Sequence, residues 1–505
     1  MSLRTDTPGV TPPFRRLLVA NRGEIAIRVI RACRELGISP IAVHSEVDAD
    51  ALHVRAADRS ELIGPAAARD SYLSIDAILD AGRRSGAEAI HPGYGFLSEN
   101  ATFAAAVEAA GFVFVGPPAS ALEALGNKLA ARRAADGGGV PIVPGTTVAL
   151  GDDTSAVAGI GYPVMLKAAA GGGGRGMRRV DREADLSDAM AAARREAEAA
   201  FGDGTIYVER MVTPARHVEV QLLGDRHGGL AVLGERDCSI QRRHQKLVEE
   251  SPSPALDEAT RSALFESARR VARTVDFHNA ATVEFLVDDR LDHFFLEMNT
   301  RLQVEHGVTE LVTGLDLVGW QIRVAAGEAL PPAVLEAPRH GHAIEVRIYA
   351  EDPYDGFRPT AGRIGAWQMP EGPGVRIDAG VAADMELRTE YDPLLVKLMV
   401  HADNRPAAVA RLRRVLDETR IGGLQTDAGF LRWLLEDPAF VAGDYDTGFI
   451  ATRWRNGPPL GGEERQLAAT LAAAAREAEA VPTRRPAPAA TSAWAREARR
   501  DALRR

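Results

Sequence analysis

Residues 163–176 read Pro-Val-Met-Leu-Lys-Ala-Ala-Ala-Gly-Gly-Gly-Gly-Arg-Gly, and this stretch decides the fold that the sequence is expected to adopt. Its apolar start predicts a β-strand that ends at Lys167, and four glycines in a row follow closely. A backbone without Cβ atoms can fold tightly over a polyanion and present successive N–H groups to it, while Lys167 and Arg175 supply positive charge. The stretch therefore predicts a glycine loop that binds a polyanion such as a nucleotide phosphate. The glycines expected at the phosphates are Gly172, Gly173 and Gly174.

Two other interpretations explain this stretch less well. It does not match G-x-x-x-x-G-K-[ST], so it is not a phosphate loop of that class. A flexible linker is the remaining alternative, although linkers seldom follow an apolar strand that ends in lysine.

Lysine is unusually rare in this chain. Only four of its 60 Lys and Arg residues are lysines, at Lys128, Lys167, Lys246 and Lys397. A compact, movable ammonium group can act where the planar guanidinium of arginine cannot, so we expect chemistry at these positions. Scattering by codon bias is the alternative for any one of them.

The overall composition limits the function classes. With 70 acidic and 60 basic side chains among 505 residues, the formal net charge is −10, which argues against a general nucleic-acid binder. Two cysteines, Cys33 and Cys238, are too few for a disulfide framework and lack zinc-site spacing. No apolar run approaches the roughly 20 residues that span a bilayer, and the polar start lacks a signal-peptide core. We expect a cytoplasmic protein without a membrane segment.

The hydrophobic pattern predicts a mixture of α/β and α+β domains. A strand at 16–20, an amphipathic helix and a strand at 40–44 form a β-α-β opening, and the pattern recurs through 87–116. We therefore expect a doubly wound parallel sheet, and without G-x-G-x-x-G a dinucleotide is not its obvious ligand. The predicted domains are 14–126, 127–332, a mixed α/β domain at 339–453, and a tail at 454–505.

Two predicted strands carry carboxylates in an arrangement typical of a magnesium site. Glu284 lies inside the apolar run 282–287, and a second strand is expected from Phe294 to about Glu305. Alternate residues of the second strand are polar, which would place them on one face. These residues are Glu297, Asn299, Arg301, Gln303 and Glu305. Carboxylate and amide oxygens suit magnesium that also binds nucleotide phosphates, whereas a half-exposed edge strand would show the same alternation.

The segment 235–246, Glu-Arg-Asp-Cys-Ser-Ile-Gln-Arg-Arg-His-Gln-Lys, contains almost no apolar residue and ends in Lys246. Its guanidinium, imidazole and ammonium groups can hold a small carboxylate-like or phosphate-like anion. A solvated loop would have the same composition, and a nucleic-acid patch disagrees with the acidic net charge.

Several motifs together resemble the biotin carboxylase family of ATP-grasp enzymes. They are Asn21-Arg22-Gly23-Glu24-Ile25-Ala26, His91-Pro92-Gly93-Tyr94-Gly95-Phe96-Leu97-Ser98-Glu99-Asn100, the glycine stretch, 235–246 and 297–310. The similarity runs from about Phe14 to Thr452. It implies an N-terminal biotin carboxylase domain, an ATP-grasp domain with a mobile lid at about 140–211, and a C-terminal biotin carboxylase domain.

The resemblance implies a role for each predicted site residue. The residues expected to bind ATP are Lys128, Lys167, the glycine stretch, Glu209, His217, Gln241 and His244. Two magnesium ions, with manganese as an alternative, fall to Glu284, Glu297 and Asn299. Bicarbonate and biotin are expected near Lys246, Arg301, Gln303, Val304, Arg347 and Tyr94. Glu305 would be the general base and Arg347 would stabilise the biotin enolate, with Lys246 and Arg301 completing the catalytic set.

The implied reaction is the ATP- and bicarbonate-dependent carboxylation of biotin through carboxyphosphate, by an ATP-dependent ligase. This would be the first half-reaction of an acetyl-CoA or other acyl-CoA carboxylase. The expected partners are a biotin carboxyl carrier protein and carboxyltransferase subunits, and the expected assembly is a homodimer. The alternatives are the biotin carboxylase subunit of a two-subunit pyruvate carboxylase, another ATP-grasp ligase that joins a carboxylate to an amine, and a non-catalytic nucleotide-binding regulatory subunit.

The sequence departs from the family pattern in three places, at which we expect activity to survive. Ala170 replaces a fifth glycine, Gly307 stands where proline is usual, and the tail is longer. The chain has no Met-Lys pair and no lysine after Lys397, so biotin is expected on a separate protein. The last 22 residues carry seven arginines and two acids, a net charge of +5 that predicts docking of an acidic partner, with a solvated end as the alternative.

Overall fold

The computed structural model describes residues 13–146, 148–150, 155–169 and 177–454, together with residues 457 and 470. All elements discussed below belong to one unit that spans residues 1–456. Several predicted features lie outside the described residues. They are Gly172, Gly173, Gly174, Ala170 and the basic tail.

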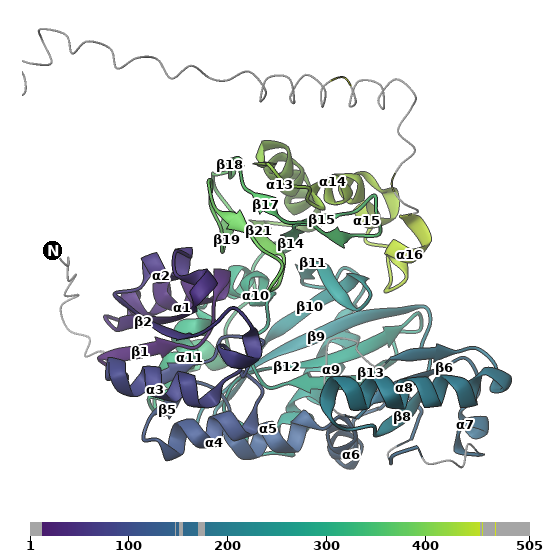
Figure 1. Cartoon of the computed structure of the whole chain (residues 1–505). Coiled ribbons are helices and arrows are strands. Elements are labelled where there is room, and N and C mark those ends of the chain that lie inside the picture. Colours follow the sequence, from purple (N-terminus) through teal and green to yellow (C-terminus); the bar gives the residue numbers. More distant parts are fainter. Residues whose placement is uncertain are drawn as a thin grey trace, which may run out of the picture. The chain divides into compact units, whose positions relative to one another are not determined.

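The N-terminal part is a five-stranded parallel sheet in the order β3-β2-β1-β4-β5 (Figure 1). Its strands are β1 (Arg16–Val19), β2 (Ser39–Ser45), β3 (Arg59–Gly64), β4 (Ala89–His91) and β5 (Val113–Phe114). Its longest helices are α1 (Gly23–Glu35), α3 (Ile75–Ser85) and α4 (Ala101–Ala109). The strand order reverses between β1 and β4, so the predicted doubly wound sheet is confirmed, and a crevice is expected at the carboxyl ends of these two strands.

The loops that follow β1 and β4 are joined directly. Asn21 Nδ2 donates hydrogen bonds to the carbonyl oxygens of Pro92 and Tyr94, both at 2.7 Å. Gly93 has a φ of +64°, and a Cβ added there would lie 2.9 Å from Asn21 Nδ2, so this position requires glycine. Two polar motifs that are distant in the sequence therefore meet at one edge of the sheet.

The predicted lid contains a three-stranded antiparallel sheet in the order β7-β6-β8. Its elements are α7 (Ser155–Ile160), β6 (Val164–Ala168), β7 (Arg178–Val180), α8 (Leu186–Phe201) and β8 (Ile206–Arg210). Leu166, Val208 and Met190 belong to a hydrophobic cluster between this sheet and α8. Lys167 lies in β6, the strand that the opening stretch predicted.

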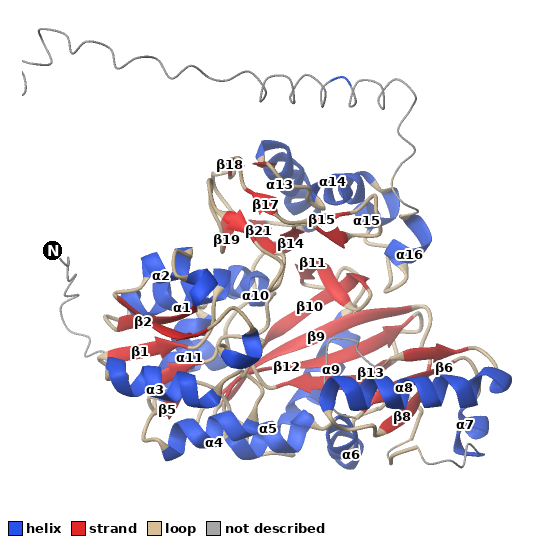
Figure 2. Cartoon of the chain, in the orientation of Figure 1, coloured by secondary structure: helices blue, strands red, loops and turns tan. Residues whose placement is uncertain are grey.

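An eight-stranded sheet in the order β13-β12-β9-β10-β11-β14-β21-β19 forms the largest layer (Figure 2). Its strands are β9 (Ala215–Gly224), β10 (Leu230–Arg242), β11 (Gln245–Ser251), β12 (Asn279–Asp288), β13 (His293–Asn299), β14 (His342–Tyr349), β19 (Val375–Ala379) and β21 (Leu394–Ala402). Strands from 127–332 and from 339–453 join where β11 pairs with β14. Leu247 of β11 and Val346 of β14 also share one hydrophobic cluster, so these two parts have a common core.

Shorter elements complete the described unit. The remaining helices are α2 (Leu52–Ala56), α5 (Ala119–Gly126), α6 (Lys128–Gly137), α9 (Glu258–Ala272), α10 (His306–Thr313), α11 (Leu317–Ala325), α12 (Pro332–Leu335), α13 (Arg405–Glu418), α14 (Ala428–Glu436), α15 (Pro438–Ala442) and α16 (Phe449–Arg453). The remaining strands are β15 (Glu351–Asp352), β16 (Arg358–Pro359), β17 (Gly362–Arg363), β18 (Ala366–Gln368), β20 (Glu386–Leu387) and β22 (Arg420–Gly422).

The structure corrects the predicted strand from Phe294 to about Glu305, because β13 already ends at Asn299. This strand is at the edge of its sheet, so no second neighbour holds its end. The chain turns away instead and buries Leu302 in a hydrophobic cluster of the N-terminal part. Glu305 consequently lies at the N-terminus of α10.

The structure also excludes a solvated loop at 235–246. Most of this segment belongs to β10, which is a central strand of the large sheet. Glu235 and Arg236 are both buried there. The lack of apolar residues therefore reflects a buried polar network.

Two other sequence expectations concern the whole chain. Among the described residues, no helix is long and apolar enough to cross a membrane. Cys33 and Cys238 are both buried free thiols.

Candidate active site

The register of four neighbouring strands builds the floor of the site. Glu297 of β13 lies opposite Glu284 of β12, and Glu284 lies opposite Glu219 of β9. Glu219 in turn lies opposite Arg236 of β10. Directly opposed residues of an antiparallel pair point to the same face, so three carboxylates and a guanidinium form one row.

Lys246 joins this row to Glu305. Its Nζ donates hydrogen bonds to Glu284 Oε1 at 2.9 Å and to Glu305 Oε1 at 2.7 Å, and also to Glu219. Burial alone would lower the pKa of Lys246, but the three carboxylates raise it well above its ordinary value. Lys246 is therefore a stable cation at the point where the carboxylates converge.

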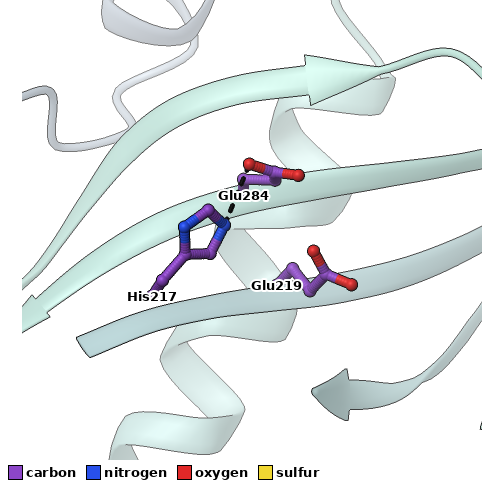
Figure 3. A group of neighbouring side chains, drawn as sticks. All are labelled: His217, Glu219 and Glu284. Atoms are coloured by element: carbon purple, nitrogen blue, oxygen red, sulfur yellow. Dashed lines mark ion pairs between the residues drawn. The ribbon is translucent and has the colours of Figure 1, made fainter. Parts of the chain in front are cut away.

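Glu284 is also held from β9, as Figure 3 shows. His217 Nε2 lies 2.9 Å from Glu284 Oε2. Burial acts to raise the pKa of Glu284, yet Lys246 and His217 lower it below its ordinary value. The potential ligand atoms of His217, Glu219 and Glu284 all lie within 4.8 Å of one another. Glu284 thus offers an ionised carboxylate close to the potential metal-ligand atoms of His217 and Glu219.

The residues predicted to hold magnesium fit this ion. Asn299 Nδ2 lies 2.9 Å from Glu284 Oε1 and 3.4 Å from Glu297 Oε1, so an amide and two carboxylates converge. Burial acts to raise the pKa of Glu297, but Lys128 lowers it below its ordinary value. Ionised carboxylate oxygens together with an amide oxygen are suitable ligands for magnesium.

Glu305 is bound between two cations. Its Oε1 accepts a hydrogen bond from Lys246, and its Oε2 accepts one from Arg347 Nη2 at 2.8 Å. Burial would raise the pKa of the Glu305 carboxyl, but Lys246 and Arg347 lower it well below its ordinary value. The carboxylate is ionised, and both its oxygens have a cationic partner.

Two buried glutamates that the sequence did not single out surround Arg347. Arg347 forms an ion pair with Glu249 of β11, and its Nε lies 4.0 Å from Glu345 Oε1 on its own strand. Burial raises the pKa of Glu249 to about 7 and that of Glu345 well above its ordinary value. Arg347 therefore lies beside two carboxyl groups whose uncharged form is favoured by burial.

Arg301 and Gln303 reach the site although they lie beyond the end of β13. Arg301 Nη2 donates to Asn299 Oδ1 at 3.2 Å, and its Nη1 donates to Gln303 Oε1 at 2.8 Å. Arg301 Nε also lies 3.0 Å from Glu99 Oε2, in the loop region after β4. The predicted residues are thus brought together by side-chain contacts rather than by a shared strand face.

A second group of ion pairs lies nearer the lid. Lys128, the first residue of α6, pairs with Glu297. Glu209 of β8 pairs with both Lys167 and Arg132, and all three side chains are buried. Two of the rare lysines are thus positioned with carboxylates on the side expected to bind phosphates.

The remaining predicted residues lie around this centre. Gln241 is opposite Lys246 in the β10–β11 hairpin, and His244 is exposed at its turn. The Tyr94 hydroxyl donates to the carboxylate of Glu24 in α1. The structure thus describes every predicted site residue except Gly172, Gly173 and Gly174.

Val304 contacts the fourth rare lysine. Its carbonyl oxygen accepts a hydrogen bond from Lys397 Nζ at 2.7 Å. Lys397 is one of the four lysines at which chemistry was expected, but no specific role followed for it from the sequence.

The sequence did contain a signal for Glu219. His217, Glu219 and Gln221 alternate with apolar residues along β9, in the way that Glu284 interrupts an apolar run in β12. All three are buried. A polar residue inside a buried strand needs partners, so the same argument that selected Glu284 would have selected Glu219.

The fold and this site together define an ATP-grasp enzyme. Three family models match the chain. They are the biotin carboxylase N-terminal domain over residues 13–122, the ATP-binding domain of the carbamoyl-phosphate synthase L chain over 127–333, and the biotin carboxylase C-terminal domain over 345–452.

Individual proteins give the same result. A biotin carboxylase of Halalkalibacterium halodurans is 49% identical over 440 residues, which cover 86% of this chain and 97% of that protein. The crystal structure of a biotin carboxylase complex with β,γ-ATP from Campylobacter jejuni has a TM-score of 0.85 at 45% identity and covers 87% of this chain and 99% of its own. A biotin carboxylase domain dimer of Hydrogenobacter thermophilus 2-oxoglutarate carboxylase, with MgADP and bicarbonate, has a TM-score of 0.84 at 43% identity and covers 87% and 97%.

The chain therefore belongs to the biotin carboxylase family. The predicted family, fold class and biotin carboxylase function are confirmed.

Proposed function

We propose that this chain carboxylates biotin with ATP and bicarbonate, using Glu305 as the general base, in the first half-reaction of an acyl-CoA carboxylase. The observation that carries the proposal is the buried Glu305 carboxylate, whose two oxygens bind Lys246 and Arg347. These contacts bring together a lysine that can bind an anion, a carboxylate that can act as a base, and an arginine. The reaction needs each of the three.

Lys246 and Arg301 would bind bicarbonate, because both are cations beside the base. In the free site Lys246 lowers the pKa of Glu305, so the carboxylate alone is a weak base. A bicarbonate anion that shares Lys246 would partly neutralise this charge and raise the basicity of Glu305 as the substrate arrives. Glu305 would then take the bicarbonate proton, and an oxygen of bicarbonate would attack the γ-phosphorus of ATP, breaking its bond to the β,γ-bridging oxygen so that ADP leaves and carboxyphosphate forms.

Arg347 would stabilise negative charge on the ureido oxygen of biotin. Its pKa is raised well above the ordinary value: burial acts to lower it, but the surrounding carboxyl groups outweigh burial. It therefore stays charged throughout the reaction. Because Nη2 contacts both Glu249 and Glu305, the guanidinium is already oriented before biotin arrives.

Glu284, Glu297 and Asn299 would hold magnesium, which supplies positive charge that neutralises the phosphates when it is bound. Lys128 and Lys167 would contact the phosphates from the other side. Closure of the lid would exclude water from the reactive intermediate. Glu209, His217, Gln241 and His244 would complete the nucleotide site.

Biotin would arrive on a separate carrier protein. Every lysine of the 505 residues is engaged, since Lys128, Lys167, Lys246 and Lys397 all pair with carboxylates. None of them is presented for covalent attachment. A streptavidin blot of the chain after expression with an active biotin ligase should show no signal, and a biotinylated band would contradict the proposal.

The assembly would include the carrier, carboxyltransferase subunits and a second copy of this chain, in the cytoplasm. The carboxyltransferase would select the acceptor, for which acetyl-CoA, propionyl-CoA, another acyl-CoA and pyruvate are the candidates. Purification of the native complex and identification of its carboxyltransferase by mass would decide among them.

The activity is tested by ATP hydrolysis with purified chain. We expect hydrolysis that requires bicarbonate and increases when free biotin is added, with carboxybiotin as the product. A carboxylate–amine ligase or a regulatory subunit would show neither dependence. Turnover without bicarbonate at the full rate would contradict the proposal.

A further inference from the structure

Lys397 is the one rare lysine to which the proposed reaction gives no task. Its side chain is 0% exposed, at the centre of β21. Burying an ammonium group is costly unless partners compensate, so its partners indicate why it is there. These partners come from three parts of the molecule.

The first partner is the backbone next to the base. Lys397 Nζ donates to the Val304 carbonyl oxygen at 2.7 Å, and the next residue is Glu305. In the ladder of β14 and β21, Lys397 lies directly opposite Arg347. The two cations therefore approach Glu305 from one sheet face, Arg347 through the carboxylate and Lys397 through the preceding peptide.

The second partner links this peptide to the N-terminal part. Glu24 Oε1 of α1 lies 3.1 Å from Lys397 Nζ, and the same oxygen accepts from the Tyr94 hydroxyl. Asp378 of β19 is a weaker partner, at 3.9 Å. A chain of contacts thus runs from Val304 through Lys397 and Glu24 to Tyr94, from the bicarbonate side to the side where biotin is expected.

Lys397 is a cation in this environment. Burial alone would lower its pKa, but Glu24, Glu345 and Asp378 raise it above its ordinary value. An ammonium group that donates to a carbonyl makes a charge-assisted bond, which is stronger than a neutral one. It can therefore fix the orientation of the peptide between Val304 and Glu305.

We propose that Lys397 is a positioning residue of the carboxylation reaction, which holds the Val304–Glu305 peptide in place by its bond to the Val304 carbonyl. This inference rests on the proposed role of Glu305. The alternative is that Lys397 only neutralises the buried charges of Glu24 and Asp378.

Four variants separate these two roles. Lys397→Met removes both the charge and the donor, and it takes from Glu24 its ion-pair partner, while the Tyr94 hydroxyl still donates to this carboxylate. Lys397→Met combined with Glu24→Gln restores the charge balance but not the donor, and Glu24→Gln alone is its reference. Arg376→Met is the matched control, because it also removes a cation that pairs with Asp378, and the other ion pair of Arg376 is with Glu310.

We expect the double variant to unfold at a temperature close to that of Glu24→Gln. Its kcat/KM for bicarbonate should nevertheless be at least about tenfold lower than that of Glu24→Gln. The KM for ATP should change less than about twofold, because the nucleotide residues are untouched. Arg376→Met should keep the KM for bicarbonate. If the double variant regains the kcat/KM of Glu24→Gln, Lys397 only balances charge and the inference is overturned.

A measurement without catalysis tests the same contact. Hydrogen exchange of the His306 and Val308 amides, which donate to the carbonyls of Gln303 and Glu305, should be at least about tenfold faster in the double variant than in Glu24→Gln. Unchanged exchange would overturn the inference. If the unmodified chain itself lacks bicarbonate-dependent ATP hydrolysis, the proposed function fails, and the exchange result still decides whether Lys397 holds the peptide.

Discussion

One ion pair at the nucleotide end and one at the base end of the site use the same kinds of charged group but differ in burial. At the nucleotide end, the side chains of Lys128 and Glu297 are 21% and 26% exposed. At the base end, those of Arg347 and Glu305 are 7% and 1% exposed. The first pair is open to incoming ligands, whereas the second is enclosed by protein before any ligand binds.

This difference follows from the cost of burying charge. A buried ion pair is held by its surroundings, because losing one partner leaves the other charge uncompensated. A half-buried pair is partly screened by solvent and can exchange its partner for a phosphate or a metal ion at smaller cost. The Arg347–Glu305 pair is therefore preorganised, and the Lys128–Glu297 pair is adaptable.

Removal of the base should give the largest effect. Glu305→Gln should lower carboxylation at least about a hundredfold while ADP binding stays nearly intact, since a positioned base contributes about that much. Steady-state kinetics and calorimetric titration with ADP would measure the two effects. Glu345→Gln is the matched control: burial raises the pKa of this carboxyl well above its ordinary value and so favours the uncharged form, which an amide resembles, and the rate should change little. Near-normal turnover of Glu305→Gln would remove this residue from the mechanism.

Adjacent glutamates of β11 should respond to pH with opposite signs. Burial acts to raise the pKa of Glu250, but His342 and Arg405 lower it from 4.5 to about 2. Ionised Glu250 therefore stabilises the folded state above about pH 4.5, and this stabilisation is lost as the pH falls toward 2. Burial raises the pKa of Glu249 to about 7, so its ionisation costs stability as the pH rises from about 4.5 through 7.

Urea unfolding across this pH range would measure both effects. Glu250→Gln should destabilise the protein by about 3 kcal/mol at neutral pH and progressively less on acidification. Glu249→Gln should gain stability relative to the unmodified chain as the pH rises from 5 to 8. If the free energies of unfolding of the two variants depended on pH in the same way, the environments of Glu249 and Glu250 would not differ as described.

The packing behind the base can be probed at Gly307. A Cβ at this position would overlap Met399 Sδ, so Met399 occupies the space that a side chain at 307 would need. Gly307→Ala should cost about 1–3 kcal/mol, and Met399→Val should relieve part of it. A double-mutant cycle on the free energy of unfolding measures this coupling. Gly126→Ala is the control, because a Cβ there meets nothing within 4 Å. Additive effects of the two changes would contradict the packing argument.

The nucleotide end should give a smaller effect that ligand concentration can reverse. Glu297→Ala and Asn299→Ala should each raise the magnesium concentration for half-maximal activity about tenfold, because each removes one oxygen ligand. Asp289→Ala, in the exposed turn between β12 and β13, is the control. An unchanged magnesium requirement in both variants would refute the metal assignment.

The fold could be predicted because its signals are local. An apolar strand that ends in Lys167 before four glycines, and the β-α-β pattern around Asn21, need no knowledge of the rest of the chain. Most candidate site residues could be predicted in the same way, since a polar residue such as Glu284 is conspicuous in an apolar strand. The resemblance to the family added their roles.

What sequence reasoning missed depends on contacts between distant segments. The strand ends at Asn299 because Leu302 packs with residues of the N-terminal part, and alternation alone cannot reveal that. Lys397 contacts Val304 because of the register between β14 and β21. The raised pKa of the Glu345 carboxyl likewise depends on which strands bury it.

The pairing of β11 with β14 also bears on how the chain can be recombined. Four register pairs, from Val248 opposite Val346 to Ser251 opposite Ala343, join the ATP-binding region to the C-terminal region. The boundary between the two family-model matches therefore crosses a hydrogen-bonded ladder rather than a linker. A chimera that exchanges only residues 345–452 with a relative would pair strands of different origin, so the C-terminal region is not an interchangeable cassette. A hybrid that folds must therefore take β11 and β14 from the same parent, so that the residues of the two strands match.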